Sequence, residues 1–142
     1  MRQLLVSFFI LTTVLASNCS GGRNKDNAAQ SAGTGNSEII FREYEHNFGK
    51  VAEGEKISYV FTFDNKGTSD LILSSATTTC GCTVPKYETK PVSGGKSGTV
   101  EVVFNTTGRS GMQTKTITVK SNAKTPVVIL KITADIENTN NK

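Results

Sequence analysis

The sequence predicts an all-β fold, an immunoglobulin-like antiparallel β-sandwich of about seven strands that follows a signal peptide and a flexible tether. Two observations lead to this prediction. Beyond Glu38, short runs alternate apolar and polar residues with a period of two, which is typical of half-buried strands. Clusters of Gly, Asn, Ser or Pro separate these runs, as turns do in all-β domains. A small barrel is the alternative architecture.

The composition fits one globular domain and excludes some classes of function. The chain has 142 residues, of which 36% are hydrophobic and 20% are charged, and this suffices for one modest core. The net charge is only +4. A nucleic-acid-binding domain presents a strongly basic face with elements that contact the bases. We therefore expect no nucleic-acid partner.

Residues 1–18 have the pattern of an export signal. Arg2 precedes an apolar run, LLVSFFILTTVLA, at residues 4–16, and a basic start before such a run is typical of a signal peptide. The run has about 13 residues, whereas a helix needs roughly 20 to span a bilayer. We therefore expect this segment to be cleaved rather than to remain in the membrane.

The end of this signal resembles a lipobox. Leu15, Ala16, Ser17 and Asn18 precede Cys19, and in a lipobox small residues precede a cysteine that is acylated and becomes the mature N-terminus. Asn18 departs from the usual Gly, Ala or Ser. The prediction is a bacterial lipoprotein, anchored by lipid on Cys19 to a membrane of the cell envelope at its periplasmic or cell-surface face. The alternative is an ordinary secretory signal that leaves Cys19 as a free or disulfide-bonded thiol.

Residues 19–37 are predicted to form the flexible tether. From Ser20 to Ser37 the sequence contains no large apolar residue, so this segment cannot contribute to a core. Its fully extended reach is roughly 60 Å. The predicted folded unit covers residues 38–138, and residues 139–142 form a polar tail.

Seven strands are predicted where the period of two holds. They lie at residues 39–44, 57–64, 70–75, 79–84, 99–105, 114–120 and 127–136. The inward-facing residues of three of these strands form the predicted core: Tyr59, Phe61, Phe63, Val100, Val102, Phe104, Val128, Leu130, Ile132 and Ala134. Turns are predicted where Gly and Asn tolerate positive φ, at residues 53–54, 65–67, 93–95, 107–111 and 121–122.

Several short motifs occur in a consistent order along the predicted folded unit. They are His46-Asn47-Phe48-Gly49, Phe61-Thr62-Phe63-Asp64-Asn65-Lys66-Gly67, Leu71-Ile72, Cys80-Gly81-Cys82-Thr83-Val84-Pro85 and the run from Thr116 to Asn122. Together they resemble the bacterial Domain of Unknown Function 1573 (DUF1573) family, over about residues 40–137. The resemblance implies an immunoglobulin-type sandwich in a protein that is commonly exported. Ser93 departs from the family pattern, which often has Pro before the following Gly.

Cys80 and Cys82 form a local pair. If Cys19 is acylated, they are the remaining thiols of a domain in an oxidising compartment. On an extended strand their Cα atoms would lie about 6.6 Å apart, near the upper limit for a disulfide. The favoured interpretation is two small packed thiols or an inert local disulfide. The alternatives are a Cu(I) site and a redox role, which is less favoured because the spacing is not Cys-x-x-Cys at a helix N-terminus.

His46 is the only histidine of the chain. Its imidazole suits a general base, a metal ligand beside Cys80 and Cys82, or a hydrogen-bonding residue where a strand begins, and the last role is favoured. No Ser, Asp or second His completes a recognisable triad with it, and no Gly-rich loop leads into a helix to bind phosphate. We therefore expect no enzymatic activity and no cofactor, apart from copper in the alternative.

Two hypotheses for the function follow. The first is a non-enzymatic interaction or structural module, held at the membrane by the lipid on Cys19, whose strand edges or loops bind another protein of the cell envelope. The second is a Cu(I)-binding or thiol-redox protein centred on Cys80 and Cys82. We prefer the first because the sequence has no recognisable catalytic residues.

Overall fold

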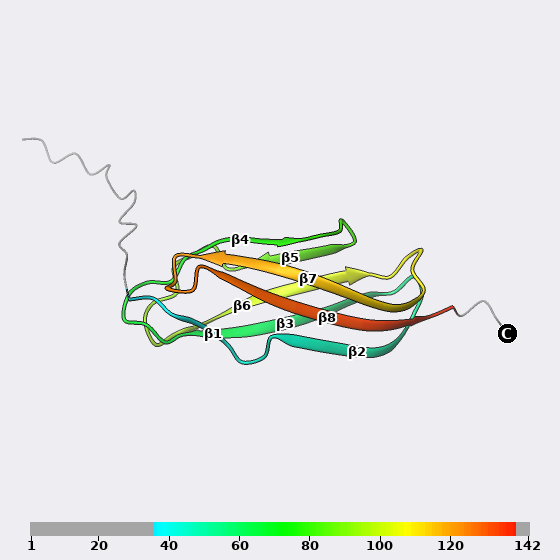
Figure 1. Ribbon diagram of the computed structural model, residues 1–142, viewed down its shortest axis with the longest axis horizontal. Coiled ribbons are helices and arrows are strands. Elements are labelled where there is room, and N and C mark those ends of the chain that lie inside the picture. Colours follow the sequence, from blue (N-terminus) through cyan, green and yellow to red (C-terminus); the bar gives the residue numbers. More distant parts are fainter. Residues whose placement is uncertain (1–35, 139–142) are drawn as a thin grey trace, which may run out of the picture. The chain divides into compact units, whose positions relative to one another are not determined.

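The computed structural model describes residues 36–138. In this part of the chain, eight strands form two four-stranded sheets (Figure 1). The strands are β1 (Ile39–Phe41), β2 (Glu45–Ala52), β3 (Lys56–Asn65), β4 (Leu73–Thr78), β5 (Thr83–Tyr87), β6 (Ser97–Asn105), β7 (Gly111–Ser121) and β8 (Val127–Glu137). The described residues include no helix that is long and apolar enough to cross a membrane.

The strand order is that of an immunoglobulin-like sandwich. One sheet has the order β1-β3-β6-β5 and the other the order β2-β8-β7-β4. β1 pairs antiparallel with β3, whereas β2 pairs parallel with β8, so the first strand of the fold is divided between the sheets. The other three strands of each sheet correspond to strands B, E and D and to strands G, F and C of that fold. The predicted fold class is confirmed, and the two separate sheets contradict the alternative of a barrel.

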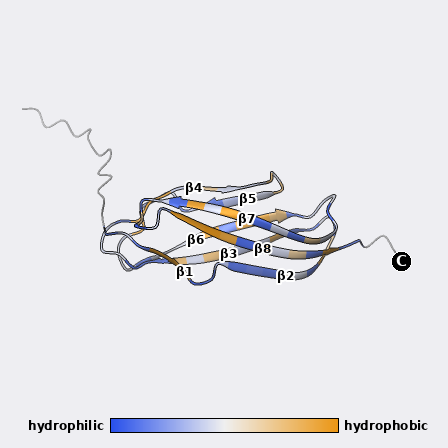
Figure 2. Ribbon diagram, viewed as in Figure 1, coloured by the Kyte–Doolittle hydropathy of each residue, from blue (hydrophilic) through white to orange (hydrophobic). Residues whose placement is uncertain are grey.

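The strand predicted at residues 39–44 is shorter in the structure, and a second strand that was not predicted follows it. β1 ends at Phe41, residues 42–44 carry the chain to the other sheet, and β2 begins at Glu45. The sequence pattern did not reveal β2 because this edge strand is largely hydrophilic (Figure 2). Its pairing with β8 is also interrupted by a bulge. Gly49 at this bulge has a φ of 69°, a left-handed conformation that favours glycine.

The strand predicted at residues 79–84 is wrong. Residues 79–82 form a turn, called the cysteine turn below, and β5 begins only at Thr83. β4 and β5 belong to different sheets, so the chain must cross between the sheets at this point. The Thr83 N–H donates a hydrogen bond to the Cys80 carbonyl (3.4 Å) and closes the turn. Both cysteines therefore lie in a sheet-crossing turn and not on the face of a strand.

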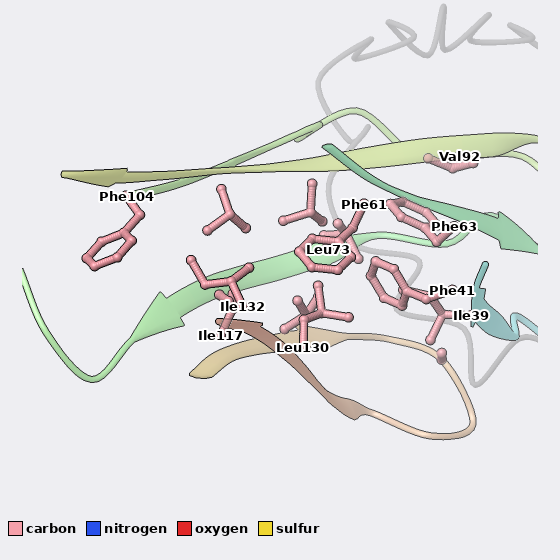
Figure 3. Close-up of a cluster of buried hydrophobic side chains, with 14 of the residues drawn as sticks. Ile39, Phe41, Phe61, Phe63, Leu73, Val92, Phe104, Ile117, Leu130 and Ile132 are labelled. Atoms are coloured by element: carbon pink, nitrogen blue, oxygen red, sulfur yellow. The ribbon is translucent and has the colours of Figure 1, made fainter. Parts of the chain in front are cut away.

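The core lies between the two sheets (Figure 3). Most of the predicted core residues are buried, namely Phe61, Phe63, Val100, Val102, Phe104, Leu130, Ile132 and Ala134. Tyr59 and Val128 are only partly buried and pack against this cluster. Further buried residues come from the other strands and from loops: Ile39, Phe41, Leu71, Leu73, Val92, Ile117, Val119, Ala123 and Ile136. Every strand except β2 and β5 contributes to the fully buried apolar cluster.

Residues 36 and 37, which the sequence assigned to the tether, contact the sandwich. Ser37 is buried, and its hydroxyl donates to the Asn122 carbonyl (3.2 Å). The Asn36 carbonyl accepts a hydrogen bond from the Thr68 N–H (2.9 Å). A Cβ atom at Gly67 would lie 1.8 Å from the Asn36 oxygen. The close approach of these two backbone segments therefore requires glycine at this position.

Candidate functional site

Hydrogen bonds hold the cysteine turn between β4 and β5. The Thr78 hydroxyl, at the end of β4, donates to the carbonyls of Cys80 and Thr83, at 2.9 Å in both cases. The Cys82 carbonyl accepts a hydrogen bond from the Asn105 N–H of β6 (2.9 Å). The backbone of the turn is thus hydrogen-bonded to β4 and to β6, which holds the backbone that carries the two cysteines in place.

Both thiols converge on the hydroxyl of Thr83. The sulfur atoms of Cys80 and Cys82 lie 3.7 and 3.9 Å from Thr83 Oγ1, and Thr83 is buried. Both cysteines are half-buried free thiols, and Gly81 between them is exposed. Two free thiols therefore lie close together on residues that are partly exposed. Such an arrangement suits either thiol–disulfide chemistry or the ligation of a soft metal ion.

Lys115 of β7 supplies positive charge beside the cysteine turn. Its Nζ atom lies 5.6 Å from the centre of the Phe104 ring, and Phe104 is the register partner of Thr83 across β6 and β5. Burial raises the pKa of the Cys80 thiol, but hydrogen bonds from Cys82 and Thr83 together with the charge of Lys115 outweigh burial. The pKa of Cys80 consequently lies below its ordinary value.

His46 does not approach the two cysteines. β2 and β4 are opposite edges of one sheet, with β8 and β7 between them, which separates them by roughly 14 Å at the usual strand spacing. The His46 ring instead stacks on Tyr59, with centroids 3.5 Å apart, and meets the edge of Phe48 at 4.7 Å. Within residues 36–138, no three His, Cys, Asp or Glu side chains form a metal-ligating group. A copper site at the thiols would therefore lack the imidazole ligand considered above.

The predicted lipidation site, Cys19, lies outside the described residues, as do the predicted signal peptide and most of the predicted tether. Acylation of Cys19 and the location that it implies therefore stay predictions from the sequence.

The four edge strands differ in their protection against further strand pairing. β1 has only three residues. β2 carries a bulge, and its charged residues Glu45 and Lys50 form ion pairs with β8. β5 contains Pro85, which has no N–H to donate. β4, with the sequence LSSATT, has neither a charge nor a proline, and its register with β7 shifts once, between Leu73 and Ser75. Short length, charges, bulges and prolines are the usual means of protecting a sheet edge, and beyond this shift at its start β4 has none of them.

The family model described as a protein of unknown function, DUF1573, matches residues 39–136. The chain belongs to the DUF1573 family. This membership confirms the resemblance drawn from the sequence motifs, and the matched residues are those of the sandwich. No curated protein matches the chain.

Solved structures share the fold of this DUF1573 domain at low sequence identity. A protein of unknown function from Porphyromonas gingivalis W83 is 20% identical, with a TM-score of 0.60, over 78% of this chain and 51% of its own. The ASH/PapD-like domain 7 of human CEP192 is 12% identical, with a TM-score of 0.59, over 87% of this chain and 99% of its own. The VesB protease of Vibrio cholerae is 16% identical, with a TM-score of 0.56, over 72% of this chain and 32% of its own.

These likenesses show the fold alone. The DUF1573 chain spans about half of the length of the Porphyromonas protein and about a third of VesB. It covers nearly the whole of the CEP192 domain, so the common element is one immunoglobulin-like module. The comparisons therefore support the fold assignment of the DUF1573 domain and leave its partner and activity to be proposed.

Thr83 and Lys115 are the residues of the thiol site that sequence reasoning missed. A signal for Lys115 was present, because it has the same phase on its strand as Ile117 and Val119, which are buried. A lysine at an inward-facing position indicates a nearby polar group or charge. Thr83 directly follows Cys82, but its contact with both thiols depends on the turn that replaced the predicted strand.

Proposed function

We propose that this chain is a lipid-anchored module of the bacterial cell envelope that binds an extended segment of another envelope protein by strand addition along β4. The observation that carries the proposal is the lack of charge and proline in β4, in contrast to the protected edges of β2 and β5. An unpaired edge offers a row of N–H and C=O groups to a partner strand. This mode of binding needs no catalytic residue.

Two exposed apolar residues flank this edge. Ile72 immediately precedes β4 and is 38% exposed, and Val84 on β5 is 54% exposed. β5 is the edge strand of the other sheet and lies beside β4. A partner strand would therefore gain apolar contacts in addition to backbone hydrogen bonds, at about 25 cal/mol for each Å² of apolar surface that it buries.

The location in this proposal is supported by the N-terminal sequence. Cys19 stands directly after an apolar run and small residues, which is the arrangement of a lipoprotein signal. Lipid on this cysteine would hold the domain within roughly 60 Å of the membrane. Mass spectrometry of the mature protein is expected to find Cys19 as the acylated N-terminal residue. An unmodified Cys19 or a retained signal peptide would contradict the anchor.

A matched pair of positions tests the edge. Thr77 on β4 and Thr118 on β7 are register partners on the same outer face, but only β4 is an edge strand. A photo-crosslinking residue at position 77 is expected to capture a defined envelope protein in cells, whereas one at position 118 is not. Thr77→Lys should abolish this complex because a lysine on an edge opposes strand addition, and Thr118→Lys should preserve it. Equal cross-linking from both positions would contradict the proposal.

A further inference from the structure

Lys115 occupies an inward-facing position of the kind that ordinarily holds an apolar residue. It has the same phase on β7 as Ile117 and Val119, and it is half-buried. Its Nζ donates to the Gln113 side chain (3.0 Å) and lies over the Phe104 ring. Among the described residues, Lys115 forms no ion pair with a carboxylate. A charge in such a position is costly unless an opposite charge compensates for it.

The cysteine turn lies where a negative charge could compensate for the charge of Lys115. β4 ends at Thr78, opposite Ile117 of β7, so no residue of β4 faces Lys115. The chain continues there as the cysteine turn. Burial raises the pKa of Cys80, and the charge of Lys115 is among the effects that reverse this and lower it. A Cys80 thiolate would thus serve as the counter-ion of Lys115.

We propose that Cys80-Gly81-Cys82 is a thiol–disulfide exchange site, in which Cys80 attacks an accessible disulfide of another molecule and Lys115 is a positioning residue that favours the Cys80 thiolate. Two half-buried thiols converge here on one hydroxyl, and Lys115 lies on β7, the strand next to the one that leads into the turn. Reactive cysteines are typically found in such electropositive, partly exposed settings. The inference goes beyond strand addition along β4 and does not depend on it.

The exchange proceeds in two balanced steps. The Cys80 thiolate attacks one sulfur of a disulfide, R–S–S–R, which forms a mixed disulfide on Cys80 and releases one thiolate, RS⁻. Cys82 then loses its proton to water and attacks the Cys80 sulfur, which forms the Cys80–Cys82 disulfide and releases the second RS⁻. Two electrons pass from the protein dithiol to the other molecule, and each released thiolate takes a proton from water.

The geometry of the turn makes the resulting disulfide easy to reduce again. The hydrogen bond between Thr83 and Cys80 closes a tight turn, in which residues i and i+2 lie closer together than on an extended strand. The disulfide would close a ring of only three residues, so it would gain little from restricting the unfolded chain and would be labile. The open space around Gly81 lets the tip of the turn adjust as the sulfurs approach.

The experiment uses the chain with Cys19→Ser, in which Cys80 and Cys82 are the only thiols. The reduced protein is mixed with oxidised glutathione or, as a protein disulfide, with insulin, and mass spectrometry follows the products. We expect the internal disulfide to form with release of thiol. Cys82→Ser should stop at the mixed disulfide on Cys80, and Cys80→Ser should react about tenfold more slowly at neutral pH because it lacks the favoured thiolate.

Two substitutions separate the positioning role of Lys115 from a structural role. In Lys115→Met and Lys115→Gln, the rate at neutral pH should fall about three- to tenfold, and the pH midpoint of the reaction should rise by about half a unit to one unit. Lys120→Met removes an exposed charge from the same strand and should change neither quantity. Circular dichroism verifies that each variant is folded.

Each outcome decides for or against the exchange site. Reaction with either disulfide supports the proposal, and the reagent that reacts shows whether the site accepts a small-molecule disulfide or a protein disulfide. Absence of the internal disulfide with both reagents overturns the proposal. So does a folded Lys115 variant that keeps the pH profile of the unsubstituted chain. If neither Lys115 variant folds, arrest of Cys82→Ser at the mixed disulfide decides instead.

Discussion

Along one side of the sandwich β1 and β2 form the edges of the two sheets, and along the other side β4 and β5 do so (Figure 1). On the first side, the His46 ring stacks on Tyr59, and the Tyr59 hydroxyl donates to the Glu43 carboxylate. This hydrogen bond, together with burial, raises the pKa of Tyr59. On the second side, β4 is uncharged and the turn to β5 carries two free thiols. The first side uses its polar groups within the molecule, whereas the second has an uncharged edge strand and two partly exposed free thiols.

The prediction with the largest expected effect compares an aromatic residue packed near β5 with one on β2. Phe104→Ala should lower the free energy of unfolding by about 3–5 kcal/mol, because Phe104 is only 1% exposed and lies below Lys115. Phe48→Ala on the other side should cost only about 1–2 kcal/mol, because Phe48 is partly buried. Urea unfolding followed by circular dichroism measures both. Equal costs would contradict this difference between the sides.

The second prediction concerns the support of the cysteine turn. Thr78→Val should lower the free energy of unfolding by about 1–3 kcal/mol, because the carbonyls of Cys80 and Thr83 lose their hydroxyl donor. Thr77→Val, at the neighbouring exposed position, is the matched control and should change stability by less than about 0.5 kcal/mol. Thermal and urea unfolding compare the two. A loss of stability in the control as large as in Thr78→Val would show that the hydroxyl bonds do not hold the turn.

The third prediction compares the stability cost of replacing one glycine on each side by alanine. Gly49→Ala should cost about 1–2 kcal/mol, because the bulge of β2 holds this residue at a φ of 69°. Gly81→Ala should be tolerated within about 0.5 kcal/mol, because its φ is not in the left-handed region and an added Cβ would meet open space. The two unfolding midpoints check this order. If Gly81→Ala were the more costly change, the cysteine turn would be less adaptable than exchange chemistry requires.

The strands and core residues that depend on a local pattern could be predicted from the sequence, whereas the features that are set by tertiary structure could not. β3, β6 and β8 alternate strongly, so Phe61, Val102 and Ile132 were correctly assigned to the core. β2 is an edge strand with few apolar residues, so its alternation was too weak to detect. The cysteine turn was predicted as a strand because a crossing between sheets leaves no periodic signal. The separation of His46 from the thiols follows from strand order, which one sequence does not encode locally.

The smallest expected effect concerns the acid stability of the first side, where Asp64 faces β1. Hydrogen bonds from Ser97, then from Lys66 and Arg42, lower the pKa of Asp64 from 3.8 to about 2. A lowered carboxyl pKa contributes stability that is fully present above pH 3.8 and is lost as the pH falls through 2.

Asp64→Asn should therefore reduce the fall in the urea midpoint between about pH 5 and pH 2. Ser97→Ala, which keeps the carboxylate but removes its main donor, should give an intermediate result. An unchanged acid profile in Asp64→Asn would mean that the ion pairs around β1 do not stabilise this side. The contrast with the β4 side would then rest on the ion pairs of β2 with β8 and on the aromatic stack of His46 and Tyr59.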